Sequence, residues 1–440
     1  MASAEARVAH VWRRLGFGPA PGDVEAGVTA GGASAVVEQL LSRPPTTAAD
    51  WNWPAEDGTW EDNTRFVSRA FELWSESARP VQDRVTWILM GLLVVAPNDF
   101  VQFRELKEHQ NRLRAWQSAP SYKALLSDVA RSGPMQKYLS GIFSMPPHPN
   151  ENLAREIMEL FSIGVTNPRT GATNYTENDV VEISRALTGY LMDWNTGAVW
   201  FEQQYWDSGN KTFLGAARGA AKLPDVVNAL VGHNSWRYYV PARVYRDLTG
   251  LTPSNATLDE LANAWGTDGN LIALVAHIAR RPEFVADATI GNRVKSPVEL
   301  LVSALRALGI KDADQFSLQW VSSMLRQNPF AAPDVAGWDN RWLHPTHLVL
   351  WSNVSYWMCW HDDGTENIPV DQRNLAVRKL ATEATSATAT DMALRLAGLY
   401  DVSSQTRSAV SSYASTGPWN WWRACGTMQL VLDSPEFLVS

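Results

Sequence analysis

Cysteine, runs of basic residues and long apolar runs are all scarce in this sequence of 440 residues. Two cysteines, Cys359 and Cys425, are too few for a disulfide framework or a zinc-thiolate site, although one bridge could form. The net charge is -8 and lysine and arginine form no run, which argues against a nucleic-acid partner. The longest apolar stretch, residues 86–95, is far shorter than the roughly 20 residues of a membrane span. We expect no membrane span and interpret this stretch as a buried helix.

Several catalytic signatures are missing as well. The sequence contains no HExxH or Glu-x-x-His pattern, and no GxSxG, Walker A or GxGxxG pattern in a usable context. These absences argue against α/β-hydrolase, phosphoryl-transfer and Rossmann-type chemistry. Only His344 and His347, among eight histidines, stand close together, and we interpret them as part of a loop or a helix cap. The sequence therefore predicts no set of metal ligands.

The composition is that of a globular protein, with 45% hydrophobic and 19% charged residues. Apolar residues recur at intervals of three and four in many segments, for example in residues 33–43, 122–133 and 297–309. No run of alternating β-branched residues competes with this pattern. We expect a mainly α fold, a large irregular multi-helix domain with long loops and a helical, tryptophan-rich C-terminal lobe.

The helical pattern is interrupted near residues 311–335. We therefore predict a main helical body at 1–310, which contains a charged helical hairpin at 148–190, and a lobe at 311–440 packed on it. The two parts could also form one continuous domain. Nine of the 21 tryptophans lie between Trp320 and Trp422, where they could form a ligand-binding wall. We favour the alternative, in which they fill the core.

The first residues, MASAEARVAHVWRRLGFG, are interrupted by charge every few positions. They have no apolar segment of the kind that forms the centre of a signal peptide. On this basis we expect the protein to be cytoplasmic.

Residues 148–164, HPNENLAREIMELFSIG, predict a helix that begins near Asn150 or Asn152 and ends at Gly164. Its leucine stripe leaves one side to polar residues. These are Asn152, Arg155, Glu156 and Glu159. Since Arg155 stands four residues from both Glu151 and Glu159, the charges could simply form a solvated face stabilised by about 0.2 to 0.5 kcal/mol per pair.

Residues 175–190, YTENDVVEISRALTGY, predict a second helix, opened by a capping box between Thr176 and Asp179. Its polar side carries Asp179, Glu182 and Arg185. The two helices, joined as a hairpin, repeat one arrangement in which carboxylates and an arginine flank an apolar seam.

If the two polar sides meet in a cleft, repulsion between carboxylates would raise one pKa and provide a general acid beside a general base. The predicted catalytic residues are Glu159 and Glu182 first, followed by Glu156 and Asp179. The predicted substrate-binding residues are Asn152, Arg155, Arg185, Lys211 and Trp338. We expect hydrolysis or elimination on a polyhydroxyl or anionic substrate, bound against a tryptophan-lined wall.

Two alternatives stay open. The chain could be a non-catalytic helical binding or scaffold protein, in which Arg155 and Glu159 are buried partners that lock the hairpin. It could instead be a metal-dependent redox protein, because the same carboxylates could bind a divalent cation. The sequence implies no particular cofactor, and a carbohydrate-like ligand and a protein partner both remain candidates.

Seven motifs are distributed along nearly the whole chain. They lie at residues 10–18, 150–164, 175–190, 211–215, 294–309, 328–338 and 432–437. Together they resemble the bacterial domain-of-unknown-function family 1800, and the central pair of helices is the most specific element because its order and spacing are hard to obtain by chance. The resemblance implies a largely helical fold but no named activity. It also implies that many relatives carry export signals and are encoded beside a sulfatase-like partner.

The resemblance further implies histidines that this sequence does not have. Relatives often carry a histidine-rich segment near residues 86–93, a histidine in place of Phe161, and a His-Asp pair where Trp206 and Asp207 stand here. If those histidines serve a metal or a proton relay, this member has lost part of it. A divergent or non-catalytic member is therefore a further alternative.

Overall fold

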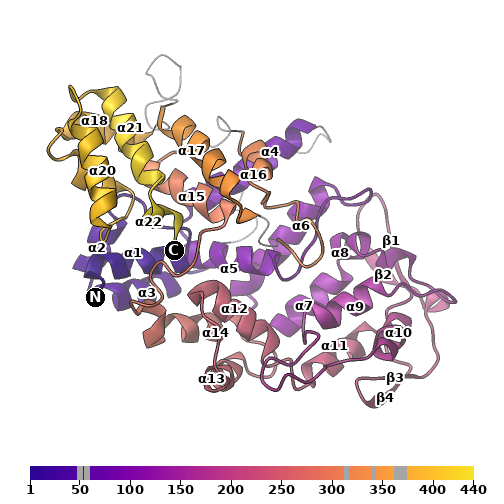
Figure 1. Ribbon diagram of the computed structural model, residues 1–440. Coiled ribbons are helices and arrows are strands. Elements are labelled where there is room, and N and C mark those ends of the chain that lie inside the picture. The colour runs from indigo at the N-terminus through magenta and orange to yellow at the C-terminus, as the bar shows by residue number, and fades with distance from the viewer. Residues whose placement is uncertain (47–52, 54–59, 312–316, 339–341, 361–373) are drawn as a thin grey trace.

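The protein is built from short helices joined by long connections (Figure 1). The computed structural model describes residues 1–46, 53, 60–311, 317–338, 342–360 and 374–440. These residues form 22 α-helices and two small two-stranded sheets. The predicted mainly α class is confirmed. Part of the predicted domain boundary, residues 312–316, lies outside the described residues.

Helices account for the regular structure from one end of the described chain to the other. The first are α1 (Ala4–Arg14), α2 (Asp23–Thr29), α3 (Ala33–Leu41), α4 (Trp60–Glu76), α5 (Pro80–Met90), α6 (Phe103–Arg114), α7 (Tyr122–Arg131) and α8 (Gly133–Tyr138). The next are α9 (Asn152–Glu159), α10 (Glu177–Ala186), α11 (Leu223–Val231), α12 (Tyr239–Thr249), α13 (Asn255–Trp265), α14 (Leu271–Ala279) and α15 (Pro297–Leu308). The last are α16 (Leu318–Met324), α17 (Pro345–Trp360), α18 (Leu375–Glu383), α19 (Ala389–Leu396), α20 (Ser404–Ser415), α21 (Trp421–Leu432) and α22 (Pro435–Leu438).

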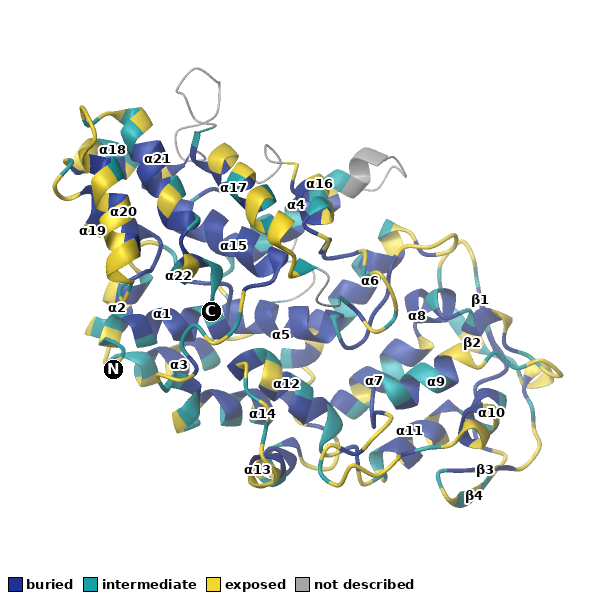
Figure 2. Ribbon diagram, viewed as in Figure 1, coloured by how far each residue is buried: buried dark blue, intermediate teal, exposed yellow. Residues whose placement is uncertain are grey.

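Helices α5 and α15 lie at the centre of the core, and every residue of both is buried (Figure 2). Both helices nevertheless carry charge into the interior. Arg84 of α5 and Arg293, just before α15, each pair with the carboxylate of Glu299 in α15. Each of these buried charges needs a partner, because a buried charge without one would destabilise the folded protein by several kcal/mol.

One hydrophobic cluster runs through the whole described chain, from Val8 to Phe437. Helix α4 packs against α15 and also against α16, so the core crosses the boundary predicted at residue 311. Arg306 of α15 adds polar links, because its guanidinium donates to the carbonyl oxygens of Gly18 and Ser75 at 2.6 and 2.8 Å. The division into a body and a lobe stays a prediction.

The beginning and end of the chain lie close together in Figure 1. Arg14 in α1 donates to the carbonyl oxygen of Ser440 at 2.7 Å, and the amide of Ser440 donates to the carbonyl oxygen of Arg293 at 2.8 Å. Lys295 is 4% exposed, and its ammonium donates to the carbonyl oxygen of Phe437 at 2.6 Å. These polar contacts join α1 and the last residues of the chain to the segment just before α15.

The apolar stretch 86–95 is buried, as predicted, but only its first half is helical. Helix α5 ends at Met90, and the residues after Gly91 continue as buried chain without helical structure. No described helix combines the length and the apolar character needed to cross a membrane.

Two short β-hairpins follow α10, and the sequence pattern does not predict them. β1 (Tyr190–Met192) pairs antiparallel with β2 (Val199–Phe201), and β3 (Lys211–Phe213) pairs antiparallel with β4 (Ala216–Gly219). The first turn is stabilised by Asp193, whose carboxylate accepts from the amides of Asn195 and Thr196 at 2.8 and 3.0 Å. Strands of three or four residues are too short to show an alternating pattern.

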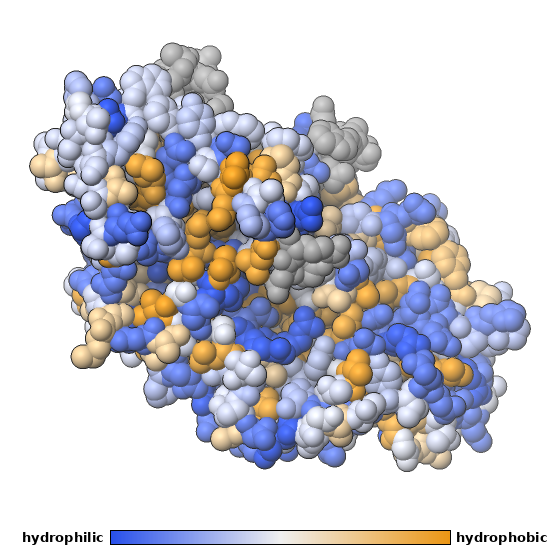
Figure 3. All heavy atoms as spheres, in the orientation of Figure 1, coloured by the Kyte–Doolittle hydropathy of each residue, from blue (hydrophilic) through white to orange (hydrophobic). Residues whose placement is uncertain are grey.

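The tryptophans of the C-terminal part do not all fill the core. Trp351 is 2% exposed, but Trp320 and Trp422 are 50% and 52% exposed, so the core-filling interpretation holds only in part. Figure 3 shows apolar residues gathered on the face that carries α17, where Leu348 and Val349 are 58% and 66% exposed. Both cysteines, Cys359 and Cys425, are buried.

Candidate functional site

The predicted hairpin of charged helices is formed by α9 and α10, which pack against each other. Helix α9 begins at Asn152, whose amide donates to the side chain of Asn150 at 2.8 Å. It ends at Glu159, one turn earlier than predicted, and the chain then turns at Gly164 with φ of 76°. A Cβ at Gly164 would clash with the ring of Tyr239 in α12, so only glycine allows this approach.

Arg155 links the two helices across their exposed side. Its guanidinium donates to both oxygens of Glu177 at 2.9 and 2.8 Å, and more weakly to Glu151 at 3.4 Å. Glu177 is 77% exposed, so this is a surface ion pair. The buried Arg155–Glu159 pair expected of a scaffold does not form. Asn152 is exposed.

Glu156 and Glu159 lie one turn apart on α9, and both are half-buried. The carboxylate of Glu159 accepts a hydrogen bond from the hydroxyl of Tyr175 at 2.6 Å. Burial, together with the nearby charges of Glu159 and Asp334, raises the pKa of Glu156 to about 7. The pKa of Tyr138 is raised to about 12 by burial and by Asp334 and Glu156. We call these five side chains the α9 acid cluster.

On α10, Asp179 holds local structure together. One oxygen of its carboxylate accepts from the amide and the hydroxyl of Thr176, both at 2.7 Å, which is the predicted capping box. The other oxygen accepts from the amide of Leu214 at 2.7 Å. Leu214 has a positive φ of 51°, so this bond supports an unfavourable turn between β3 and β4. Every oxygen of Asp179 therefore has a structural partner.

Glu182 and Arg185 form the rest of the polar side of α10. Glu182 accepts from Arg185 and from the amide of Thr212, both at 2.8 Å. Arg185 also donates to Asp207 at 2.8 and 3.2 Å. The Lys211 side chain is fully buried beside Asp207, with its ammonium 3.8 Å from the carboxylate and 2.9 Å from the carbonyl oxygen of Gly209. Burial lowers the pKa of Lys211.

The structure thus separates the two polar sides that the sequence analysis brings together. Within the described part of the chain, no hydrogen bond or ion pair joins Glu156 or Glu159 to Glu182 or Arg185. The side chains of α10 face the segment 207–214 and hold it. On α9, Glu159 instead bonds with Tyr175, and the charge of Asp334 acts on both Glu156 and Tyr138.

Trp338 lines a cavity of about 180 Å³ beside α5 and α12. Its indole donates to the carbonyl oxygen of Asn328 at 2.9 Å and its ring lies 4.7 Å from that of Trp87. The glycine before it, Gly337, has φ of 91° and approaches the end of α5 so closely that a Cβ would lie 3.1 Å from the oxygen of Gly91. Gly337 thus brings Trp338 against α5.

The same cavity is lined by charged residues from three segments: Arg84, Arg243, Asp247 and Arg293. Arg84 and Arg293 are paired with Glu299, whereas the bonds that Arg243 makes with other described residues are long, at 3.3 Å to Gly91 and 3.4 Å to Tyr239. Bonds of this length are weak, so the Arg243 guanidinium retains capacity to bind an anion.

Two connections join this cavity to the α9 acid cluster. Asp334, whose charge raises the pKa of Glu156, is two residues from Ala336 in the cavity wall. Tyr239, which contacts the turn after α9, accepts the hydrogen bond from Arg243.

Several residues of this region are absent from the sequence-based prediction. They are Tyr138, Tyr175, Arg243 and Asp334. Tyr175 opens the second helix motif and could have been noticed there. Tyr138 and Arg243 belong to segments that carry no distinctive pattern. Asp334 lies in the motif at residues 328–338, but nothing in that motif indicates that it approaches α9.

The described residues contain no group of three or more histidine, cysteine, aspartate or glutamate side chains arranged to hold a metal ion. In the His344–His347 pair, the Nδ1 atom of His344 bonds with the hydroxyl of Thr346 at 2.8 Å. That of His347 bonds with the carbonyl oxygen of Trp342. These bonds agree with the interpretation that the pair organises a loop and the start of α17.

Comparison with known proteins gives a single result. A family model described as a protein of unknown function (DUF1800) matches residues 10–439, nearly the whole chain. No curated protein and no solved structure matches it significantly.

Proposed function

We propose a function on the premise that the chain belongs to the family of proteins of unknown function DUF1800, whose description names no activity. The proposed function is acid/base catalysis, either hydrolysis or elimination, at the α9 acid cluster. The observation that carries the proposal is the half-buried pair of Glu156 and Glu159, one turn apart and in different settings. Unequal carboxyl groups of this kind can serve as acid and base.

Glu156 would act as the proton donor. Its pKa of about 7 keeps a large share of the carboxyl group protonated near neutral pH, which suits the protonation of a leaving oxygen. Glu159, which accepts the hydrogen bond from Tyr175, would act as the carboxylate. It would remove a proton from water in hydrolysis, or from carbon in elimination.

The neighbouring cavity would hold the substrate. Arg243 can bind a negatively charged group, and Trp87 and Trp338 provide aromatic surface against a sugar ring or an apolar group. This arrangement agrees with the expected polyhydroxyl or anionic substrate. It replaces Glu182 with Glu156 as the partner of Glu159.

A panel of glycosides and uronate esters would test the proposal. We expect Glu156→Gln and Glu159→Gln to lower turnover by at least about 100-fold, the usual contribution of a positioned acid or base, without loss of helical structure. Glu151→Gln, on the same helix but in the surface pair with Arg155, is the matched control and should retain activity. Unchanged turnover in Glu156→Gln would refute the assignment.

A non-catalytic binding or scaffold protein is the second candidate, and one observation favours it. The polar side of α10 is fully engaged with the segment 207–214, as a structural ion-pair network would be. This candidate predicts no turnover of any compound in the panel by the folded wild-type protein.

A further inference from the structure

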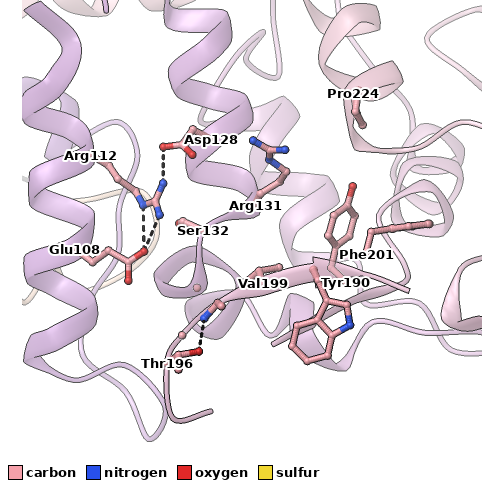
Figure 4. Close-up of a pocket in the computed structure, with 14 residues that line it drawn as sticks. Glu108, Arg112, Asp128, Arg131, Ser132, Tyr190, Thr196, Val199, Phe201 and Pro224 are labelled. Atoms are coloured by element: carbon pink, nitrogen blue, oxygen red, sulfur yellow. Dashed lines mark hydrogen bonds and ion pairs between the residues drawn. The ribbon is translucent and has the colours of Figure 1, made fainter. Parts of the chain in front are cut away.

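A larger cavity, of about 540 Å³, lies between α6, α7 and the β1–β2 hairpin (Figure 4). Helices α6 and α7 form one wall, the hairpin forms the opposite wall, and Pro224 at the start of α11 closes one end. Its volume is in the range of about 300 to 1,000 Å³ that small-molecule pockets have. We call it the hairpin pocket.

The hairpin wall is held firmly in place. A Cβ on Gly133, at the start of α8, would lie 2.6 Å from the carbonyl oxygen of Gly197, so the hairpin touches α8 at a position that glycine alone allows. Arg104 of α6 donates to the carbonyl oxygen of Asn195 in the hairpin turn at 2.8 Å. The pocket is therefore formed before a ligand arrives, which lowers the entropy lost on binding.

Glu108, Arg112 and Asp128 form a fixed row of charges on the helical wall. Arg112 donates to one oxygen of Glu108 at 2.8 and 3.2 Å and to one oxygen of Asp128 at 2.6 Å. In the described part of the chain, the second oxygen of each carboxylate accepts no hydrogen bond. Because Arg112 holds both carboxylates in place through their first oxygens, the two second oxygens are fixed acceptors for hydroxyl groups of a ligand.

Arg131 provides a different group. It lines the pocket, is exposed, and makes no hydrogen bond or ion pair with any described residue. In Figure 4 no dashed line joins it to the other residues drawn. The charges of Glu108 and Asp128 are already balanced in part by Arg112, so Arg131 is the cation available to a ligand. A planar guanidinium binds a carboxylate through two parallel hydrogen bonds.

Aromatic side chains cover the hairpin wall. Tyr190, Trp200 and Phe201 all line the pocket, and Trp200 is 45% exposed. Such surfaces pack against the C–H face of a sugar ring while hydroxyl groups reach polar side chains around it.

We infer that the hairpin pocket binds an acidic sugar, a ring that bears several hydroxyl groups and one carboxylate. The carboxylate pairs with Arg131, hydroxyl groups donate to Glu108 and Asp128, and the ring lies on Trp200. None of these residues belongs to the α9 acid cluster, so this inference goes beyond the proposed function and does not depend on it.

Binding of four sugars to the full chain, measured by ligand-observed NMR and calorimetry, tests the inference. The sugars are D-glucuronate, D-galacturonate, trigalacturonate and the neutral D-glucose. We expect both monosaccharide acids to bind at least about tenfold more tightly than glucose, because a charge-assisted bond to Arg131 is lost with the neutral sugar. Tighter binding of the trisaccharide than of the single units would identify a polysaccharide as the source, and equal binding would identify a free sugar acid.

Variants assign the binding to the pocket. Arg131→Ala should weaken binding of the acids about tenfold and leave glucose unchanged, whereas Trp200→Ala should weaken all four sugars. The matched controls are Trp194→Ala, an exposed tryptophan of the same hairpin outside the pocket, and Arg237→Ala, an exposed arginine elsewhere. Both should bind as the wild type does. Glu156→Gln should also bind normally, which separates this site from the proposed catalytic one.

Three results would overturn the inference. They are equal affinity for glucose and the sugar acids, undiminished binding in both folded Arg131→Ala and Trp200→Ala, and no saturable binding of any of the four sugars. Circular dichroism and thermal unfolding confirm that each variant is folded before binding is compared.

Discussion

Arg155 reaches across from α9 to α10 and donates to both carboxylate oxygens of Glu177, at 2.9 and 2.8 Å. The two residues are 22 positions apart, and the pair lies on the protein surface. Solvent and salt weaken an exposed pair, however good its geometry. The ion pair that joins the two helices is therefore separate from the proposed catalytic carboxylates, Glu156 and Glu159, which lie on the half-buried side of α9.

We predict a small effect when this surface pair is removed. Arg155→Met and Glu177→Gln should each shift the urea midpoint only slightly, and the double variant should equal the sum of the two at high salt. A double-mutant cycle at low and high ionic strength is the measurement. A large coupling energy between the two substitutions that persists at high salt would contradict this prediction, because it would mean that the ion pair is shielded from water.

Asp179 should matter more for stability, although it lies on the same helix. Asp179→Ala removes the carboxylate that accepts from Thr176 in the capping box and from the amide of Leu214, and we expect a loss of about 1 to 3 kcal/mol in the free energy of unfolding. Hydrogen exchange gives a local measurement, because the amide of Leu214 should lose protection. Glu177→Ala, in the same first turn, is the control and should leave Leu214 protected.

Glu156 should make stability depend on pH in a characteristic direction. Its pKa rises from 4.5 to about 7 on folding, so the folded protein binds the proton more tightly than the unfolded chain does. The stabilisation is complete below about pH 4.5 and is lost as the pH rises through 7. Relative to Glu156→Gln, the wild type should lose roughly 1 to 2 kcal/mol over this range, less than the full shift would give because the group is partly exposed.

Urea denaturation of wild type and Glu156→Gln at a series of pH values would measure that difference. Comparison with the Gln variant cancels contributions from other titrating groups, including His10 and His109, whose pKa values burial lowers to about 3 and about 4. A flat difference from pH 4.5 to 7 would contradict the raised pKa. Glu151→Gln should follow the wild-type curve.

Glu299 should be the most costly carboxylate to neutralise. Burial opposes its charge, but Arg293 and Arg84 overcome this and hold its pKa well below the usual range. Glu299→Gln leaves both arginines without their counter-charge in the core, and we expect a loss of about 3 to 5 kcal/mol. Chemical denaturation at pH 7 measures it. Glu38→Gln, which breaks a pair at the surface, is the comparison and should have little effect.

The sequence predicted the local structure of the central hairpin well. The capping box of Thr176 and Asp179 is present as predicted, because such a signal depends on neighbours within a few residues, whereas α9 ends at Glu159 and not at Gly164. The same holds for the apolar periodicity of α15. These features explain why the helical class could be recognised.

The partners of the charged side chains could not be predicted in the same way. Glu182 bonds with Thr212, 30 residues further on, through a β-hairpin whose strands are too short to recognise. Asp334 approaches Glu156 from a segment near the other end of the chain. Lys295 is buried because Phe437 covers it. In each case tertiary packing decides which polar groups meet, and sequence spacing carries no information about it.

The contacts between distant parts of the chain also have a consequence for folding kinetics. Helical proteins usually fold fast because most of their contacts are local, but here Arg14 bonds with Ser440, 426 positions away, and His10 bonds with Phe284, 274 positions away. Helix α1 reaches its native surroundings only after these long loops have closed. We therefore expect refolding to be slower than the helix content suggests, and α1 to be among the last helices to gain protection from hydrogen exchange.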